Sequence, residues 1–308
     1  MHTVNKFFQK IKKIHRKNNL MFLDDNVINF KLNPKELNLL KKIIILIIER
    51  NENKKLFTFK KAYKFLNKTK FYRLNKNLND FVELEKIIIQ ILKKRLLLND
   101  FIKGIEFPAG LRILHPGTPK QLKGKFQTTS IHCDPWAGEP DDMINVVMYV
   151  QVSKDTPKLM IKKINNEVLR NNYSMNSFYK TKHYLNSNKY FKNMENYQSL
   201  NSHNLKHVNG ECYLFKGFVP HGTIKEGNKV RIGLEFRLRT KDPYLNIKRF
   251  LSKINRSGRY WLLPKNKIST FDERLRNELK KIKKKRNSNE LELLRKKELL
   301  RFYGIKIG

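Results

Sequence analysis

Acidic residues are scarce in this chain of 308 residues. Aspartate and glutamate together number 27, against 66 lysines and arginines, so the formal net charge is +39. A coding bias towards lysine, asparagine and isoleucine would produce such a charge without any function. That bias explains the abundant lysines better than the missing acids, however, and we therefore expect some attraction to anionic partners. Both explanations stay open.

Cysteine and long apolar runs are also scarce. Cys133 and Cys212 are too few for a disulfide framework, and the N-terminus lacks the long apolar run of a secretory signal. The most apolar stretch, residues 43–48, is far shorter than the roughly 20 residues that span a bilayer. These absences predict a cytoplasmic protein without a transmembrane segment. We expect both cysteines to be small buried residues rather than nucleophiles.

Several common motifs are missing as well. The sequence contains no internal repeat, no Walker-type phosphate loop, no GxGxxG and no CxxC pair. What it does contain, over residues 1–104, is apolar residues at helical spacing, which predict helices over about 34–50 and 80–98. Asn33 followed by Pro34 is typical of the start of a helix. We expect this helical N-terminal region to pack on a β-rich core.

The first 20 residues form a special case within that region. Phe7, Phe8, Ile11 and Ile14 recur at helical spacing among basic residues. Such a helix could lie on a membrane or on an anionic partner. We favour the plainer interpretation, in which the helix packs on the domain.

From about residue 105 the sequence pattern changes to short apolar or alternating runs, separated by glycine and proline. Such runs predict the strands of a sandwich or barrel, which we place at residues 105–243. The polar segment 164–207 interrupts them and is predicted to be a partly helical insertion or lid. Residues 244–308 are predicted to be a basic helical C-terminal extension. The predicted strands are LRILHP, FQTTSIHCD, MINVVMYVQV, KLMI, CYLFKGF and VRIGLEFRLR.

The stretch HCDPWAGEP, residues 132–140, concentrates residue types that are rare elsewhere. His132 and Asp134 are two positions apart at the end of a predicted strand, so both side chains point to one face. His221, after the predicted strand CYLFKGF, is the candidate for a third ligand. Two histidines and one carboxylate on one face of a metal form the facial triad of non-haem Fe(II) oxygenases. The plainer alternative is a chance HxD pair with a structural histidine, which is also how we interpret His115.

Arg231 favours the metal site. It follows His221 by ten positions, on a strand that alternates polar and aliphatic residues. If the aliphatic face lies under helices, the arginines point into a polar interior, where a guanidinium can bind a carboxylate through two hydrogen bonds. Arg237, on the same strand face, is the second candidate for this role. The polar face comprises Arg231, Gly233, Glu235 and Arg237, and the aliphatic face comprises Ile232, Leu234, Phe236 and Leu238.

HCDPWAGEP, MINVVMYV and YLFKGFVPHGTIKEGNKVRIGLEFRLR together resemble the Fe(II)/2-oxoglutarate-dependent oxygenases of the phytanoyl-CoA dioxygenase-like superfamily. Within it, the likeness is nearest to bacterial oxygenases of carbohydrate and aminoglycoside biosynthesis clusters, which share an H-x-D-x-W-x-G pattern. The resemblance covers roughly residues 105–243 and implies a double-stranded β-helix, which is a jelly-roll or cupin-like fold. This chain departs from the pattern after NVVMYV, where it reads QVSKDTPKLMI, and that departure bears on the substrate more than on the metal site.

The resemblance also implies roles for individual residues. His132, Asp134 and His221 would bind Fe(II), and Arg231 would pair with the distal carboxylate of 2-oxoglutarate. Thr223 would add a hydrogen bond to this cosubstrate. Weaker candidates for the lining of the pocket are Gln127, Thr129, Asn145 and Trp136, of which Trp136 would serve equally well as plain core.

The predicted function is oxidation of a small-molecule substrate, by hydroxylation or otherwise, with release of succinate and CO2. A sugar-type or phosphorylated metabolite would suit both the resemblance and the basic surface. A cupin-like metal protein without oxidative chemistry is one alternative, which Arg231 argues against. A basic nucleic-acid-binding or ribosome-associated protein on the same barrel is the other. The net charge and the run KKIKKKRN support it, but no recognised nucleic-acid motif accompanies them.

Overall fold

The structure is a computed structural model, and the fold is described for the parts of the chain that it places. Most of the predicted C-terminal extension and of the predicted insertion lies outside them, so their roles stay predictions. The described residues are 2–18, 20–69, 74, 78–96, 102, 104–107, 109–116, 131–134, 142–165, 197, 199–224, 226–240 and 260–262.

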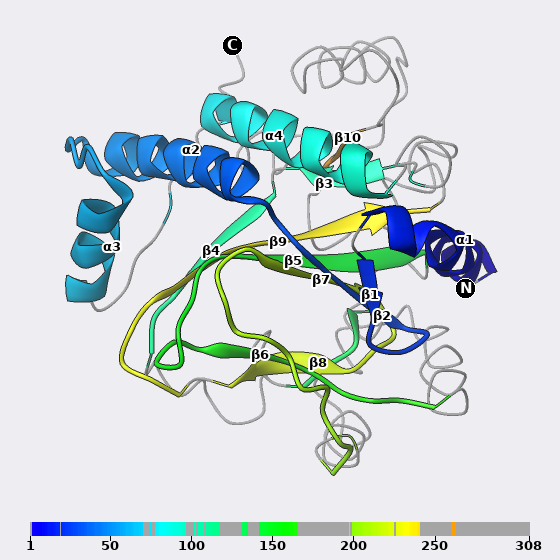
Figure 1. The fold of residues 1–308 in the computed structure, drawn as a ribbon. Coiled ribbons are helices and arrows are strands. Elements are labelled where there is room, and N and C mark those ends of the chain that lie inside the picture. Colours follow the sequence, from blue (N-terminus) through cyan, green and yellow to red (C-terminus); the bar gives the residue numbers. More distant parts are fainter. Residues whose placement is uncertain are drawn as a thin grey trace, which may run out of the picture.

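An antiparallel sheet of eight strands forms the centre of the molecule (Figure 1). The strand order is β1-β2-β7-β5-β9-β3-β10, and β4 pairs with β9 as well. The strands that come together are therefore far apart in sequence. The bounds are β1 Leu20–Phe22, β2 Val27–Lys31, β3 Gly104–Phe107, β4 Gly110–Leu114, β5 Met143–Gln151, β7 Glu211–Lys216, β9 Arg231–Arg239 and β10 Tyr260–Leu262.

Helices cover one face of this sheet, as Figure 1 shows for α2 and α4. Leu234, Phe236 and Leu238 of β9 belong to the same buried cluster as Ile44 and Leu92 of the helices. Burial of this aliphatic face is a main source of the stability of the fold, because each large apolar side chain contributes about 1.5 to 3 kcal/mol. The helices are α1 His2–Asn18, α2 Pro34–Glu52, α3 Phe59–Lys68 and α4 Leu78–Leu96.

The helix starts and faces follow from the local sequence. Asn33 caps α2, its side chain accepting a hydrogen bond from the backbone of Glu36 while the Glu36 side chain accepts one from the backbone of Asn33. The predicted helices at 34–50 and 80–98 are confirmed with shifted ends. In α1, Phe7 and Phe8 are buried in the main cluster, which confirms the packed interpretation of that helix.

A second, two-stranded sheet lies on the other face of the main sheet (Figure 1). It pairs β6, Lys158–Ile161, with β8, His221–Ile224. A smaller apolar cluster fills the space between the sheets, joining Leu159 and Ile161 of β6 to Tyr149 of β5 and Phe215 of β7. The core is therefore β-rich and antiparallel. The complete double-stranded β-helix stays a prediction, since most of the predicted strand FQTTSIHCD lies outside the described residues.

Two strands occur where the sequence predicts only helices. Residues 20–22 and 27–31 form β1 and β2, which extend the main sheet beside β7. In VINFK, consecutive apolar side chains contact different layers: Val27 lies in the cluster between the sheets and Ile28 in the cluster under the helices. A strand buried on both faces lacks the alternation that reveals a strand. Among the described helices, none is long and apolar enough to cross a membrane.

Candidate metal centre

His132 and His221 are brought together by the backbone. Their peptide groups form an isolated antiparallel bridge, with N–H to O distances of 2.9 Å in both directions. Residues opposite each other in an antiparallel pair have side chains on the same face. The two imidazole rings accordingly lie together, with centroids 4.4 Å apart. His221 is the first residue of β8, so the small sheet fixes one end of this bridge.

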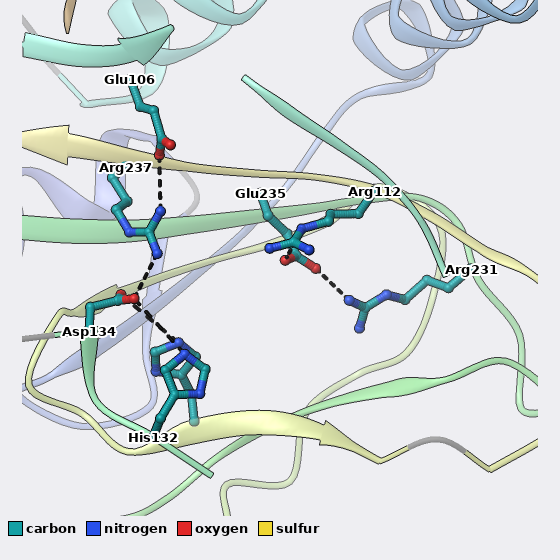
Figure 2. Close-up of polar contacts among 8 residues, drawn as sticks. Glu106, Arg112, His132, Asp134, Arg231, Glu235 and Arg237 are labelled. Carbon is teal, nitrogen blue, oxygen red and sulfur yellow. Dashed lines mark hydrogen bonds and ion pairs between the residues drawn. The ribbon is translucent and has the colours of Figure 1, made fainter. Parts of the chain in front are cut away.

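Asp134 completes a compact group with the two histidines. The three side chains each offer one ligand atom, and these atoms lie within 4.8 Å of one another. Asp134 Oδ1 is 4.0 Å from His132 Nε2, and Asp134 Oδ2 is 4.0 Å from His221 Nε2. Asp134 is 1% exposed and His132 is 5% exposed, so the group is shielded from water. Figure 2 shows the side chains of His132 and Asp134 pointing toward one another.

The hydrogen bonds of His221 leave one ring nitrogen for a metal. Its Nδ1 lies 3.0 Å from the carbonyl oxygen of Val219, and a carbonyl only accepts, so Nδ1 carries the hydrogen. In the neutral ring, Nε2 then keeps its lone pair on the side of Asp134. The Phe215 ring packs edge-on against this imidazole, with centroids 4.8 Å apart. A backbone partner of this kind orients the histidine ligands of metal sites.

The charge of Asp134 is stabilised by Arg237. The Arg237 Nη2 group donates a hydrogen bond of 2.7 Å to Asp134 Oδ1, and Nη1 lies 3.3 Å from the Glu106 carboxylate. Burial alone would raise the pKa of Asp134, but the positive charge of Arg237, together with a smaller effect of the two neighbouring imidazoles, reverses this. The pKa of the carboxyl is therefore lowered well below its usual range.

A divalent cation fits this donor set. Asp134 Oδ2 is buried and accepts no hydrogen bond from the part of the chain that the structure describes. A buried acceptor without a partner is unfavourable, and a cation between Oδ2 and the two Nε2 atoms would satisfy it. Two neutral imidazoles and one carboxylate are suitable ligands for Fe(II).

Arg231 and Arg237 lie on the same face of β9, and the aliphatic residues between them lie under the helices, which confirms the predicted alternation. Arg231 is fully buried, and its guanidinium carbon lies 5.8 Å from the centroid of the Tyr149 ring. Its Nη2 donates to Glu235, a partner that the sequence did not predict. Its Nε and Nη1 make no hydrogen bond within the described residues. Glu235 also pairs with Arg112 at 3.1 Å, as Figure 2 shows.

The remaining predicted residues divide into two groups. Thr223 pairs with Leu159, so it faces the space between the sheets, and it is half-buried. Asn145 pairs with Arg237 in the register of β5 and β9; it is buried, and its Nδ2 has no hydrogen-bond partner among the described residues. Gln127, Thr129 and Trp136 lie outside the described residues, so their places at the site stay predictions.

The cysteines and the remaining candidate histidine behave as predicted for buried structural residues. The Cys133 thiol donates to the carbonyl of Phe218 at 3.2 Å, and burial, together with the Asp134 charge, raises its pKa well above the usual value. Burial also raises the pKa of Cys212. His115 is buried, and burial lowers its pKa. None of these pKa shifts favours a reactive thiolate or a charged imidazole.

Sequence reasoning missed the contacts that surround the triad. Strand alternation placed Arg237 on the inner face, but nothing in the sequence indicated that its guanidinium would join Asp134 to Glu106. Tyr149 was missed entirely: its hydroxyl lies 3.1 Å from His207 Nδ1, and burial raises its pKa to about 12. It lies in a long apolar run, where a tyrosine is indistinguishable from core by pattern alone.

Comparison with known proteins adds only distant likenesses. No family model matches the chain, and no curated protein matches it either. Among solved structures, it is similar to an N-substituted L-amino acid dioxygenase from Burkholderia ambifaria AMMD in complex with alpha-KG. That likeness has 11% identity and a TM-score of 0.35, and it covers 70% of this chain and 83% of the other.

A second structure of the Burkholderia dioxygenase has 12% identity and a TM-score of 0.34, covering 75% of this chain and 88% of the other. A prolyl-4-hydroxylase from Pseudomonas putida has 11% identity and a TM-score of 0.32, covering 68% of this chain and 98% of the other. These structural neighbours are a dioxygenase and a prolyl hydroxylase, but the scores are low. The assignment of the site therefore rests on its own geometry.

Proposed function

We propose that this protein is an Fe(II)- and 2-oxoglutarate-dependent oxygenase that oxidises a small metabolite of sugar or phosphorylated type. The observation that carries the proposal is the buried group of His132, Asp134 and His221, whose ligand atoms lie within 4.8 Å of one another. Two histidines and one carboxylate bind a metal on one side and leave the opposite positions open for other ligands. The distant dioxygenase likenesses are compatible with this proposal but do not carry it.

When bound, Fe(II) would allow O2 to oxidise 2-oxoglutarate to succinate and CO2 with one oxygen atom and the substrate with the other. The chain's own part is to bind, orient and exclude water. His221 is oriented through the Val219 carbonyl, and His132 through its backbone bridge to His221. Burial of Asp134 keeps water away from the carboxylate, which strengthens its interaction with a cation.

Arg231 is the residue that we assign to the distal carboxylate of 2-oxoglutarate. Its guanidinium is fully buried, and two of its nitrogens are left without a partner among the described residues. A carboxylate bound to those nitrogens would satisfy them through charge-assisted hydrogen bonds. Thr223 and the unpaired amide of Asn145 face the same interior, and we assign them supporting contacts to the cosubstrate.

Arg237 is assigned a different task from Arg231. It holds Asp134 Oδ1 at 2.7 Å, whereas Oδ2 has no hydrogen-bond partner among the described residues. We infer that Asp134 would offer Oδ2 to the metal and that Arg237 is the positioning residue that holds Oδ1. Binding through one oxygen leaves more coordination positions open than binding through both.

The proposal is tested by anaerobic Fe(II) binding with and without 2-oxoglutarate, followed by succinate release in air. We expect His132→Ala, Asp134→Ala and His221→Ala to abolish iron binding. Arg231→Gln should leave iron binding intact and weaken 2-oxoglutarate by about 2 to 4 kcal/mol, because a buried charge-assisted contact is lost. Iron binding without any effect of 2-oxoglutarate would instead support a non-oxidative metal protein.

A further inference from the structure

A second feature of the molecule lies in α3 and the loop before it, which are not part of the metal centre. Phe57, in the loop between α2 and α3, is 72% exposed. Its φ is 63°, in the left-handed region that bulky side chains rarely adopt. An aromatic ring that is exposed to this degree does not contribute to packing of the core, and its strained backbone conformation is unfavourable. Strain of this kind is typical of functional positions.

The loop is built to hold Phe57 in this position. Glu49 Oε1 accepts hydrogen bonds from the backbone N–H groups of Leu56 at 2.6 Å and Phe57 at 2.7 Å. These two bonds lower the pKa of Glu49. The carboxylate therefore stays charged and continues to accept both hydrogen bonds from the loop. Thr58, the next residue, caps α3 by accepting from the N–H of Lys61. The ring is thus presented outward by a fixed scaffold.

The loop that carries the ring and the helix that follows it are basic, although the Glu49 carboxylate of α2 contacts the backbone of the loop. Residues 53–69 contain no acidic residue. The Lys61 ammonium lies 5.6 Å from the centroid of the Phe57 ring. Positions 60, 61, 64 and 68 of α3 are all exposed, and Phe57 is exposed in the loop that leads into this helix. The spacing of three or four from Lys60 and Lys61 to Lys64, and from Lys64 to Lys68, places these lysines on one side of α3. We call this stripe the Phe57 surface; it comprises Phe57, Lys60, Lys61, Lys64 and Lys68, with Lys54 and Lys55 beside it in the loop.

We propose that the Phe57 surface binds single-stranded nucleic acid, with Phe57 stacking on a base and the lysines contacting phosphates. Exposed aromatic rings next to rows of basic residues bind single strands in this way, whereas paired bases are not open to stacking. A membrane fits less well, because a helix that lies in a membrane exposes a broad apolar face. The apolar residues Ala62 and Leu66 of α3 are instead buried in the protein. This inference is independent of the proposed oxygenase.

The test uses the full-length protein and a fluorescent oligonucleotide of about 20 thymidines, longer than the roughly 4 to 16 nucleotides that one binding domain covers. Fluorescence anisotropy at several salt concentrations gives the affinity and its salt slope. We expect Phe57→Asn to weaken binding about tenfold, the loss of one stacked base, with an unchanged slope. Asparagine tolerates positive φ, so the same variant should melt at a higher temperature than the wild type.

The lysines are tested by the triple variant Lys55→Ser, Lys60→Ser, Lys61→Ser. It should lower the salt slope by about 2, since each phosphate contact on a single strand contributes about 0.7. The matched control is Lys6→Ser, Lys13→Ser, Lys31→Ser, which removes the same charge from exposed positions in α1 and β2. The control should leave binding near the wild-type value apart from a small uniform loss.

Three results would overturn the proposal. The first is no binding of the oligonucleotide at low salt. The second is an equal loss of binding in the two triple variants, which would mean that only overall charge matters. The third is binding to vesicles of phosphatidylserine and phosphatidylcholine that Phe57→Asn weakens while oligonucleotide binding is unchanged, because the surface would then bind membranes. Binding that depends on Phe57 and on the neighbouring lysines supports it.

Discussion

Arg237 shows how one residue can decide the chemistry of its neighbours. Its guanidinium lies between two carboxylates, Glu106 at 3.3 Å and Asp134 at 2.7 Å, and all three groups are wholly or largely withdrawn from water. Two buried carboxylates next to a metal site would repel each other without this cation. Figure 2 shows the row from Glu106 through Arg237 to Asp134 and His132. Arg237 therefore keeps the Asp134 carboxylate ionised and holds it in one orientation.

The first prediction at the residue scale concerns Arg237→Gln. Removing the cation frees Asp134 Oδ1, so a metal can bind through both carboxylate oxygens. We expect the visible absorption spectrum of the Co(II)-loaded protein to change and the effect of 2-oxoglutarate on that spectrum to shrink, while Co(II) binding persists. Arg237→Lys should restore part of the wild-type spectrum. A spectrum identical to that of the wild type in Arg237→Gln would contradict the assignment.

Arg239→Gln is the matched control, because Arg239 lies on the same strand and also pairs with a buried aspartate. Its guanidinium contacts Asp142 at 2.6 and 3.1 Å, and Asp142 is not part of the triad. Breaking this pair should lower the free energy of unfolding by about 2 to 4 kcal/mol. The Co(II) spectrum of the folded variant should stay that of the wild type.

At the scale of elements, α3 is tied to the strand that carries Arg231. The Tyr63 hydroxyl donates to the carbonyl of Val230 at 3.0 Å, and the N–H of Val230 donates to Asn67 Oδ1 at 2.8 Å. Val230 directly precedes Arg231. The helix thus fixes both backbone polar groups of Val230, the residue just before β9, which restricts the direction in which the Arg231 side chain leaves the backbone.

We predict that Asn67→Ala weakens 2-oxoglutarate binding without changing metal binding. The variant leaves the Val230 N–H without its partner, at a cost of about 1 to 3 kcal/mol in the free energy of unfolding. Isothermal titration with Mn(II), and then with 2-oxoglutarate in its presence, measures the two affinities separately. Lys64→Ala, an exposed change in the same helix, is the control. Equal losses of both affinities would show a general loss of structure instead.

Helix α4 contributes a buried acid whose titration should be visible in stability. Burial raises the pKa of Glu85 to about 8, opposed by the N–H of Ala109, which donates to it at 2.7 Å, and reinforced by the charge of Glu106. Because the folded state holds the proton more tightly than the unfolded state, stability falls as pH rises from the ordinary glutamate range to about 8.

Glu85→Gln removes this titration and keeps an oxygen that can accept from Ala109. We expect the stability of the variant relative to the wild type to increase as pH rises. The difference in the free energy of unfolding should reach roughly 3 to 5 kcal/mol above the pKa of Glu85 in both the unfolded and the folded state. Urea denaturation at mildly acidic and mildly alkaline pH measures the difference. Glu83→Gln is the control, since Glu83 is exposed in the same helix and pairs with Lys86. A pH-independent difference for Glu85→Gln would refute the prediction.

On the scale of the whole molecule, the candidate metal centre joins segments that are distant in sequence. His132 and Asp134 precede β5, whereas His221 begins β8 in the small sheet. A metal that binds only the folded state should therefore raise the free energy of unfolding, by about 2.7 kcal/mol at a free concentration of 100 times Kd. Thermal melts with Co(II) measure this.

The controls separate specific from general metal effects. His221→Ala should remove the rise in melting temperature that Co(II) causes. His115→Gln should retain it, because His115 is buried outside the group of three ligands. A rise of the same size in both variants would place the metal elsewhere.

Several helices, one strand face and the three candidate metal ligands could be predicted from local sequence patterns. Helical spacing and the Asn33-Pro34 cap predicted α2 and α4, and alternation in VRIGLEFRLR predicted which face of β9 lies under the helices. The rare residues of HCD and the later His221 predicted a triad before any contact was known. Such features depend on neighbours within a few positions, where the geometry of a helix or strand fixes which side chains share a face.

The tertiary structure decided what those side chains meet. The bridge between His132 and His221 and the hydrogen bond from Arg237 to Asp134 join residues that are far apart in the sequence. The register between strands that are far apart in the chain determines such contacts, and no local pattern encodes it. The same holds for β2, which is buried on both faces because the helices cover one face of the sheet and the cluster between the sheets covers the other.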